Sequence, residues 1–520
     1  MSEVPAVRRG GRRSRNALRM NPKPLSERPV RAGLVGGDYK PLSDHEVLRI
    51  HQTALRLMEE IGLAQAIPSM VELVTAAGGW MKAGRLCFPS QLVEDIIAKA
   101  RRSYIMYGQD DAHNLDIGGK RVHTGTGGAA PLVIDFESGK FRRSTALDVY
   151  DIARLVDTLD NIHFYWRSVV AGDMPDWHAV DLNTTYAALS GTTKHIGVSY
   201  ADGESVYNAV DMMDMILGGE GSFRKRPVCS ISCCHVVPPL RFAEDSCHAL
   251  EAAVRSGMPA TLLSAAQAGA TSPAALAGTL AQAVAETLAG LVFSYLIDPM
   301  CQVNLGIWPF VSDLRTGAMS GGSAEQALLS AGGAQMGAFY DLPMSTASGM
   351  ADSKIPDAQS GSEKAYSLAL TAQAGATLIM ESVGMQASLM AACYEAFVID
   401  NDMLGAVQRT VRGIEVSDET LSFEVIKDVV FGEGHFLGHD QTLASMERDY
   451  FYPSVGDRSS PQDWTDAGAK DIRERAREKT RQILSEHYPE HIDEATDRKV
   501  RENFKILVPR EAMKFGNGRW

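Results

Sequence analysis

The most constraining feature of this chain is a repeated alternation of short apolar segments with longer helical patterns, which begins near residue 146. Each helical pattern is long enough to serve as the crossover that two parallel strands require. Candidate strands are 162–170, 195–200, 228–233, 260–265, 301–305, 342–347 and 377–381. Candidate helices are 147–157, 177–188, 205–216, 241–254, 274–297, 324–336 and 361–374. Seven candidate strands, with an eighth unassigned, predict an α/β fold of the closed (β/α)₈ TIM barrel type.

A doubly wound sheet is the alternative α/β fold, and the glycine pattern argues against it. No candidate strand opens into G-x-G-x-x-G with an acidic residue about 20 positions later. The glycine-rich stretch 125–128 lacks that spacing, and a Walker phosphate loop is absent from the sequence. The barrel is therefore the favoured architecture.

The remaining segments predict four regions. Residues 1–40 read as a flexible basic arm, 41–145 as an N-terminal α/β cap, 146–460 as the catalytic barrel and 461–520 as a C-terminal helical extension. The extension carries a charged helix at 471–486 with little apolar stripe, which we interpret as a solvated face or a contact surface for a neighbouring subunit. Six arginines lie in the first 20 residues of the arm: Arg8, Arg9, Arg12, Arg13, Arg15 and Arg19.

Charge and hydropathy narrow the possible partners. The net charge of −13 argues against a nucleic-acid-binding surface, which needs a concentrated basic face. The longest apolar run, 288–297, is shorter than the roughly 20 residues of a membrane span. No apolar stretch follows the paired arginines of the arm, as an export signal requires. We expect a cytoplasmic protein with no nucleic-acid or membrane partner.

Reactive side chains of a barrel lie at the carboxyl ends of its strands. Those positions here hold aromatic residues and two carboxylates, Asp352 and Glu381, a composition suited to an organic cation, and Glu381 is a candidate catalytic residue. A quaternary ammonium has no N–H to donate, so aromatic faces and negative charge must bind it, each cation–π contact contributing roughly 0.5 to 2 kcal/mol. The candidate aromatic walls are Tyr165, Trp166, Tyr200 and Trp308. Each of these rings can equally be part of the core.

Cys233-Cys234-His235 is the one local cluster of metal-ligating residue types. Zinc sites place their cysteines two to four residues apart, and neighbouring residues of a strand point to opposite faces. We therefore expect no metal site. A metal-dependent barrel hydrolase or lyase that uses these residues with Glu381 remains an open alternative. The seven cysteines form no regular framework and predict reduced thiols.

One long segment resembles a known family. Residues 339–359, with the sequence FYDLPMSTASGMADSKIPDAQ, match in spacing the part of the trimethylamine methyltransferase family that carries pyrrolysine in its archaeal members. Met350 occupies the pyrrolysine position. Further segments resemble family signatures in the family's order: 272–280, 398–402, 416–421 and 463–471. The resemblance covers roughly residues 40 to 490 and also implies a TIM barrel.

The resemblance implies an activity and its partners. Family members transfer a methyl group from a methylated amine to the corrinoid of a separate small protein, and they are commonly oligomeric. We therefore expect a cognate corrinoid protein as partner, no cofactor bound by this chain, and a homo-oligomer. A near match to a corrinoid-binding motif at 111–116 has Asp116 in place of the glycine, and we interpret it as chance.

The methionine at position 350 bears on which amine we expect as the substrate. A methionine offers neither an electrophilic imine nor a proton, so we expect it to line the pocket rather than to activate trimethylamine. The branch of the family without pyrrolysine includes glycine betaine methyltransferases, and glycine betaine is the first candidate substrate. Its carboxylate needs a donor, for which we consider His235, Gln267 and Asn304. Asp352 is a further candidate for substrate binding, or it caps the loop.

Other substrates and classes remain open. Proline betaine and carnitine need a roomier pocket, and trimethylamine is the family's other substrate type. A non-catalytic betaine-binding module is a third class, beside the methyltransferase and the metal-dependent barrel enzyme.

Overall fold

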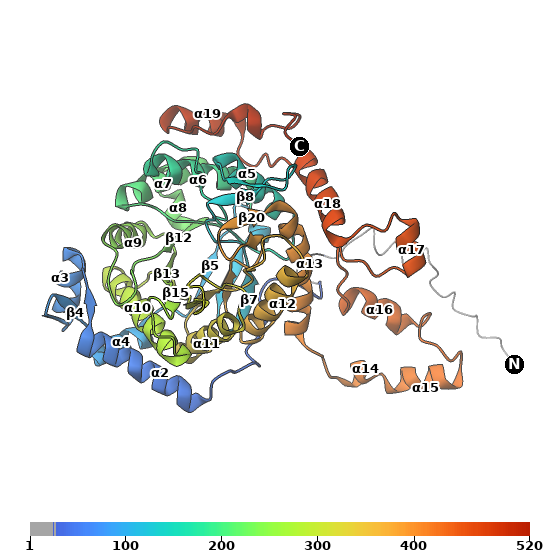
Figure 1. Cartoon of the computed structure of the whole chain (residues 1–520), viewed down its shortest axis with the longest axis horizontal. Helices are drawn as coiled ribbons and strands as arrows, with labels where there is room; N and C mark the ends of the chain where they lie inside the picture. The colour runs from blue at the N-terminus through green and yellow to red at the C-terminus, as the bar shows by residue number, and fades with distance from the viewer. Residues whose placement is uncertain (1–23, 25–27) are drawn as a thin grey trace.

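A computed structural model describes residue 24 and residues 28–520 of the chain, and in this part eight parallel strands form a closed ring (Figure 1). The predicted (β/α)₈ barrel is confirmed. The ring strands are β7 (Arg121–Thr124), β10 (Tyr165–Trp166), β11 (Ile196–Val198), β12 (Cys229–Cys233), β13 (Ala260–Ser264), β15 (Val303–Ile307), β17 (Met344–Ala347) and β18 (Leu378–Met380).

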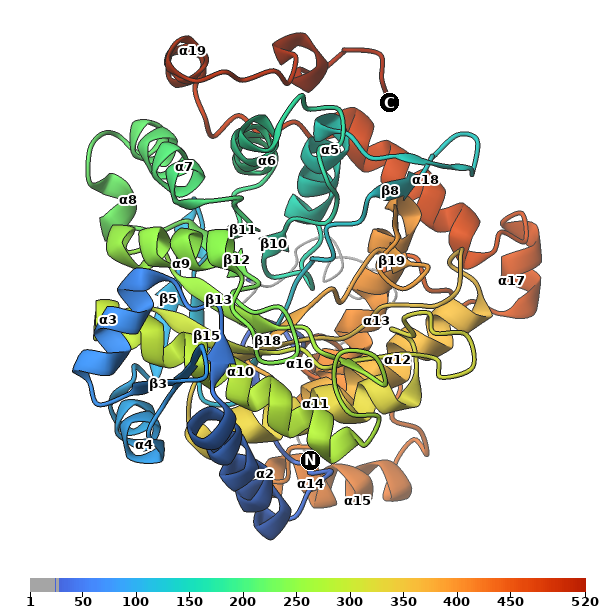
Figure 2. The same ribbon diagram turned by 60° about the vertical axis from the view of Figure 1, so that its left-hand side comes forward.

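Helices alternate with these strands and surround the ring (Figures 1 and 2). They are α5 (Ala146–Asp157), α6 (Trp177–Gly191), α7 (Gly203–Ile216), α9 (Glu244–Ser256), α10 (Leu276–Ile297), α11 (Ala324–Tyr340), α12 (Ala358–Gln373) and α13 (Tyr394–Arg412). Several begin at side-chain caps that the sequence supplies, such as Thr145 with Asp148 at the start of α5. Apolar side chains of strands and helices form one continuous core between the two layers.

The ring closes between its first and second strands. β7 pairs in parallel with β18 on one side, and the chain beyond it pairs in parallel with β10 through the bridge between Gly125 and Phe164. β7 is the eighth strand that the sequence left unassigned. It lies inside 41–145, so the barrel begins before residue 146, and the expected boundary is wrong.

Part of the expected arm is folded. β1 (Leu34–Val35) pairs antiparallel with β7, with Leu34 opposite Val122. The segment 28–40 therefore contributes to the barrel rather than to a flexible arm. The six arginines of the first 20 residues lie outside the described residues.

The N-terminal α/β region covers the side and the amino end of the barrel. α2 (Asp44–Arg56) packs along α10 and α11, together with α3 (Pro68–Ala76) and α4 (Ser90–Lys99). The hairpin β5 (Ser103–Met106) and β6 (Leu115–Gly118) lies at the amino ends of the strands. There Asn304 Nδ2 donates to the Tyr104 hydroxyl at 3.3 Å. These elements thus leave the carboxyl ends of the ring strands free.

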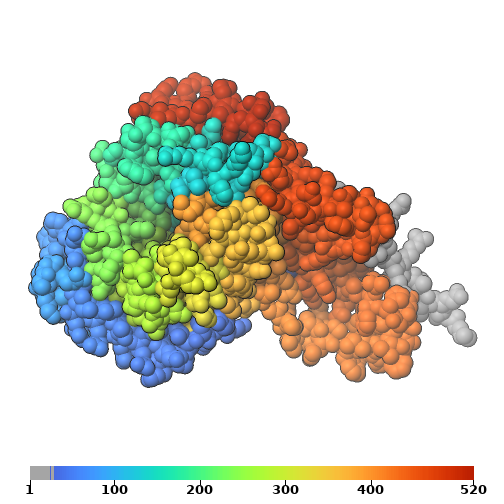
Figure 3. Space-filling model, viewed as in Figure 1, coloured from blue at the N-terminus to red at the C-terminus, as the bar shows by residue number. Residues whose placement is uncertain are grey.

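The C-terminal region has a projecting part and a packed part (Figure 3). The projecting part comprises α14 (Asp418–Leu421), α15 (Phe423–Phe431) and α16 (Asp440–Arg448). Beyond α17 (Pro461–Asp466), α18 (Ile472–Glu486) packs on α13 and α5, and α19 (Glu494–Asn503) lies near α7. α18 buries Ala476, Thr480, Ile483 and Leu484, so this charged helix contacts its own chain rather than only solvent or a neighbouring subunit.

α10 is long and apolar enough to cross a membrane by length and composition. Most of its apolar window is buried inside the protein, against β13 and β15. Its composition is that of a core helix.

Candidate functional site

Short additional strands extend the loops at the carboxyl end of the barrel, and we call the part of the molecule that these loops enclose the recess. β14 (Gln267–Ala268) and β16 (Phe310–Val311) pair just beyond β13 and β15. On another side, β19 (Met385–Gln386) and β20 (Ala391–Cys393) join β8 (Leu132–Ile134) and β9 (Phe141–Arg143) in a small sheet. Side chains that point inward at this end can contact a bound molecule.

Glu381 is the acidic group of the recess. It follows β18 directly, and its φ of 60° breaks the alternation of the strand. A Cβ placed on Gly127, at the end of the first ring strand, would lie 3.0 Å from Glu381 Cγ. The carboxyl group is buried, and within the described chain its Oε2 atom has no hydrogen-bond partner. Burial raises the pKa of Glu381 to about 8.

Cys234 and Arg167 follow ring strands at the carboxyl end of the barrel and act on each other through space, and Arg167 is also acted on by Asp181, Tyr165 and Tyr200. Cys234 follows β12 and is exposed, yet burial raises the pKa of its thiol. Both observations fit a side chain that lines a recess, which solvent enters and protein atoms surround. Arg167 lowers the pKa of this thiol and Glu381 raises it, so a cationic and an anionic group lie near one sulfur atom.

Arg167 has unusual surroundings for an arginine. It follows β10 and is half-buried, and burial lowers the pKa of its guanidinium. Its side chain forms no hydrogen bond or ion pair in the part of the chain that the structure describes, and its Nε atom is fully enclosed. Sequence analysis missed this residue. The signal was a basic side chain directly after Trp166, at the end of a strand.

The aromatic candidates divide between two faces of the strands. Trp166 and Trp308 point into the barrel, where the Trp166 ring covers Gly197 and Trp308 Nε1 donates to Ser345 Oγ at 3.1 Å. Both rings are almost fully buried. Tyr165 and Tyr200 point outward, contrary to expectation: the Tyr200 hydroxyl lies 3.3 Å from Thr185 Oγ1 on α6, and Tyr165 donates to the Val149 carbonyl on α5.

Two of the three expected carboxylate donors are directed elsewhere. His235 packs on α10, with its Nε2 atom 3.0 Å from the Glu286 carbonyl oxygen. Asn304 lies at the amino end of β15, where it also donates to Thr261 Oγ1. Gln267 in β14 is half-buried at the rim of the recess. His235 and Gln267 both follow ring strands at the carboxyl end of the barrel, but the His235 ring is turned to α10.

Met350 and Asp352 belong to the loop that follows β17. Met350 is fully buried, and a Cβ placed on Gly321 would lie 3.0 Å from the Met350 Cβ. The Asp352 carboxylate accepts hydrogen bonds from Ser320 Oγ and Ser388 Oγ, each at 2.7 Å. Asp352 thereby links three loops around the recess.

The cysteine–histidine cluster does not converge. Cys233 Sγ contacts the Ser246 carbonyl oxygen on α9, and His235 turns to α10, while Cys234 faces the recess. Among residue 24 and residues 28–520, no group of three or more His, Cys, Asp and Glu side chains could hold a metal ion. The arrangement gives no support to a metal-dependent site built from Cys233, His235 and Glu381.

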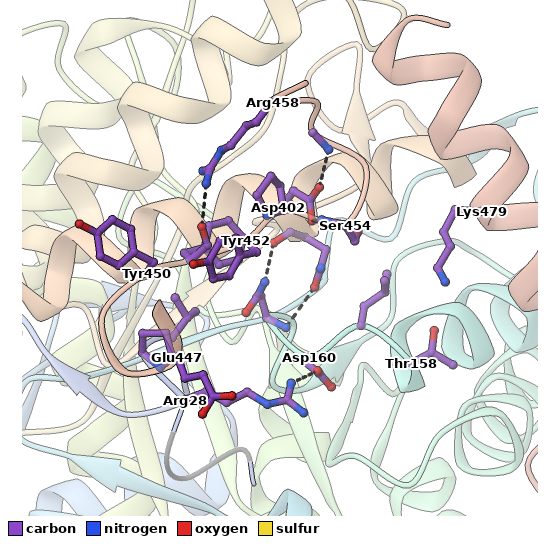
Figure 4. Close-up of a pocket in the computed structure, with 18 of the residues that line it drawn as sticks. Arg28, Thr158, Asp160, Asp402, Glu447, Tyr450, Tyr452, Ser454, Arg458 and Lys479 are labelled. Carbon is purple, nitrogen blue, oxygen red and sulfur yellow. Dashed lines mark hydrogen bonds and ion pairs between the residues drawn. The ribbon is translucent and has the colours of Figure 1, made fainter. Parts of the chain in front are cut away.

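Of the surface cavities outside the recess, two bear on the location of the site. One, of about 780 Å³, lies at the amino end of the barrel, between the loop before β10 and the segment that follows α16 (Figure 4). Its polar lining includes Asp160, Asp402 and Arg458. The other, of about 380 Å³, lies between the loops that follow β14 and β16, on the same side as the recess. Catalytic groups of barrels lie at the carboxyl end, so we assign the larger cavity no catalytic role.

The chain is similar to methyltransferases over nearly its whole length. Residues 8–506 match the family model for trimethylamine methyltransferase (MTTB). A trimethylamine methyltransferase from Desulfitobacterium hafniense (strain DSM 10664 / DCB-2) is 32% identical, over 94% of this chain and 98% of the relative. A glycine betaine methyltransferase from Desulfitobacterium hafniense (strain Y51) is 28% identical, over 89% and 96%. The solved monomethylamine methyltransferase of Methanosarcina barkeri is 12% identical, with a TM-score of 0.49 over 87% of this chain and 95% of that chain.

Proposed function

The chain belongs to the trimethylamine methyltransferase family, and from this membership we propose that it removes a methyl group from a quaternary amine, with glycine betaine as the first candidate. The relatives show the reaction class: the protein is a methyltransferase acting on methylated amines. Relatives named for trimethylamine and for glycine betaine are about equally similar to it, so the choice between these substrates rests on the residues of the recess.

The observation that carries the proposal is the buried carboxyl group of Glu381, which has no hydrogen-bond partner at Oε2 among the described residues. An ionised carboxylate in such surroundings is costly, which is why its pKa is raised to about 8. An organic cation beside it would favour the ionised form and offset that cost. A quaternary ammonium supplies this positive charge, and it has no N–H group that would need a hydrogen-bond acceptor.

Met350 supports a quaternary donor over trimethylamine. In the transfer, the C–N bond breaks and its electron pair remains on nitrogen. A quaternary amine therefore leaves as a neutral tertiary amine and needs no proton. The thioether of Met350 is fully buried and can supply no proton, so its position is compatible with a donor that needs none.

The methyl acceptor in this proposal is a corrinoid on a partner protein, whose reduced cobalt takes the methyl group. This chain binds the amine, orients one methyl group toward the opening and excludes water from the other side. Cys234 is exposed at the recess and Gln267 is half-buried at its rim, so the acceptor can approach from outside. Trp166 and Trp308 close the interior below. We place the reaction in the cytoplasm.

We also propose that copies of this chain associate. The projecting segment of α14 to α16 carries large apolar side chains in solvent: Phe423 is 71% exposed and Phe431 is 86% exposed. Exposed apolar patches of this kind mark protein contacts. Light scattering on the purified protein should give the mass of more than one chain, and Phe431→Ser should shift it downward. A monomeric wild-type protein would contradict the association.

The test of the proposed function is methyl transfer to free cob(I)alamin, with release of the demethylated amine as the readout. Glycine betaine, proline betaine, carnitine, choline and trimethylamine are offered separately. We expect transfer from a quaternary amine and none from trimethylamine. Glu381→Gln should lower the rate at least tenfold, while Glu72→Gln, on the exposed face of α3, should not change it.

Two outcomes would overturn the proposal. Transfer from trimethylamine alone would assign the family's other substrate. Silence with all five amines, repeated with a corrinoid protein present, would favour a binding module that has lost transfer.

A further inference from the structure

We infer that Arg167 binds the carboxylate of a zwitterionic substrate, which makes the donor an amino-acid betaine rather than choline or a simple amine. The inference rests on the proposed function for the reaction that follows binding. It assigns to Arg167 the role for which His235, Gln267 and Asn304 were considered.

The first support is that the Arg167 side chain is without a partner. In the described part of the chain its guanidinium makes no hydrogen bond and no ion pair, although the residue is half-buried and its Nε atom is fully enclosed. Burial of an arginine is costly unless an anion is paired with it. A carboxylate can accept two parallel N–H bonds from the guanidinium, the arrangement for which arginine is best suited.

The second support is the position of Arg167 relative to Glu381. Arg167 follows β10, Glu381 follows β18, and both act on the thiol of Cys234 with opposite sign. The recess therefore presents one cation and one potential anion, neither of them in an ion pair with another described residue. A betaine carries its quaternary ammonium and its carboxylate a few bonds apart. It can offer the ammonium to Glu381 and the carboxylate to Arg167 at the same time.

Asp181 on α6 is the acidic group that could pair with the Arg167 guanidinium before a substrate binds. Its charge acts on Arg167 through space and raises the arginine's pKa, against the larger effect of burial. The two side chains form no ion pair, and Asp181 Oδ2 accepts from the backbone N–H of Ala201 at 2.7 Å. Burial raises the pKa of Asp181 to about 6. Asp181 thus offsets part of the charge and leaves the N–H donors of Arg167 available.

The remaining polar candidates do not compete for the carboxylate. His235 and Asn304 are engaged on α10 and at the amino end of the barrel. Gln267 is neutral and lies at the rim. Arg167 is thus the cationic donor beside Cys234.

The test measures binding directly, by calorimetry on the full-length purified protein. The probes are glycine betaine, proline betaine and carnitine, and choline serves as a quaternary amine without a carboxylate. Arg167→Gln should weaken the best-bound betaine by about ten- to a hundredfold and choline by no more than about twofold. Arg167→Lys keeps the positive charge but loses the paired N–H donors, so its betaine affinity should lie between those of the wild type and Arg167→Gln. Arg498→Gln, on exposed α19, is the matched control and should leave all affinities unchanged.

The outcomes distinguish a failure of the role of Arg167 from a failure of the proposed methyl transfer. Equal losses for betaine and choline, or no binding of any of the three betaines to the wild-type protein, overturn the role of Arg167. Arg167-dependent betaine binding without methyl transfer overturns the proposed function and leaves this inference standing. If Arg167→Gln fails to fold, Arg167→Lys decides: an unchanged ratio of betaine to choline affinity would refute the inference.

Discussion

Glu381 lies directly against the backbone of Gly127, so that a Cβ on Gly127 would stand 3.0 Å from Glu381 Cγ and 3.2 Å from its backbone nitrogen. These two residues follow the last and the first strands of the ring, β18 and β7, and their close approach constrains the position of the Glu381 side chain. The absence of a side chain at Gly127 therefore belongs to the geometry of the recess.

Gly127→Ala should displace the Glu381 side chain and also strain the backbone, because Gly127 has a φ of +157°. We expect weaker binding of quaternary amines and a loss of methyl transfer of about tenfold or more, because a small misplacement of a binding group is costly. Gly361→Ala is the control, since a Cβ there meets nothing within 4 Å and the position is helical. Unchanged kinetics in Gly127→Ala would show that the carboxyl position is not critical.

The raised pKa of Glu381 predicts how stability depends on pH. Between 4.5 and about 8 the folded protein keeps this proton while the unfolded chain has lost it. The contribution of Glu381 to stability therefore falls as pH rises through that window, by at most about 1.4 kcal/mol per pH unit. Urea unfolding at pH 5 and pH 8 should show wild type losing a few kcal/mol relative to Glu381→Gln. A constant difference between the two proteins would contradict the raised pKa.

A quaternary cation should also displace the Glu381 proton. The bound positive charge lowers the pKa of the carboxyl group, so at pH 7 binding should release a fraction of a proton. Calorimetry in two buffers with different ionisation enthalpies measures that release. Glu381→Gln should bind with none, and proton release that persists in this variant would assign it to another group.

Trp166 depends on Gly197 for its place inside the barrel. A Cβ on Gly197 would lie 2.0 to 2.4 Å from atoms of the indole, which is too close for any side chain. Gly197→Ala should destabilise the protein by about 1 to 3 kcal/mol or more, because the rigid ring must move. It should also shift the tryptophan fluorescence. A variant with wild-type stability would show that the ring has free space on its other side.

The sequence predicted the barrel because its apolar segments and helices alternate at the right lengths. It missed the strand Arg121–Thr124, because a small sheet rather than a helix follows it directly, and the βα rhythm starts only at α5. It also could not assign inward and outward faces, since a shift of one residue exchanges them. Trp166 and Tyr165 are neighbours on one strand, and the first points inward while the second points outward. Glu381 was found by position, but its positive φ has no signal in sequence.

The segment 398–402 shows why a family signature need not mark the site. Lys364 Nζ lies 2.6 Å from the Asp400 carboxylate, in a buried ion pair between α12 and α13. Asn401 accepts from the backbone N–H of Asn161, at the amino end of β10. Asp400 also accepts from the backbone N–H of Gly384 at 2.8 Å and so holds the loop after Glu381 on α13, whereas Asn401 fastens the amino end of the barrel. Their similarity to the family reports the architecture rather than the chemistry.

Asp402 extends this reasoning to a stability test. Its carboxylate accepts from the backbone N–H groups of Ser454, Val455 and Gly456 at 2.8, 2.7 and 3.0 Å, and so holds the segment after α16 on α13 (Figure 4). Asp402→Ala leaves these donors without their charged acceptor, and we expect a loss of about 2 to 4 kcal/mol. Asp457→Ala, an exposed residue of the same segment, should cost under about 0.5 kcal/mol.

The location of Asp402 separates its effect from catalysis. It lies at the amino end of the barrel, so Asp402→Ala should keep wild-type affinity for amines while its urea midpoint falls and protease cuts appear near residues 449–458. Equal stability of Asp402→Ala and Asp457→Ala would mean that other contacts hold the segment. Lost amine affinity in a fully folded Asp402→Ala would instead connect this end of the barrel to the recess, because nothing in the direct contacts of Asp402 reaches Glu381 or Arg167.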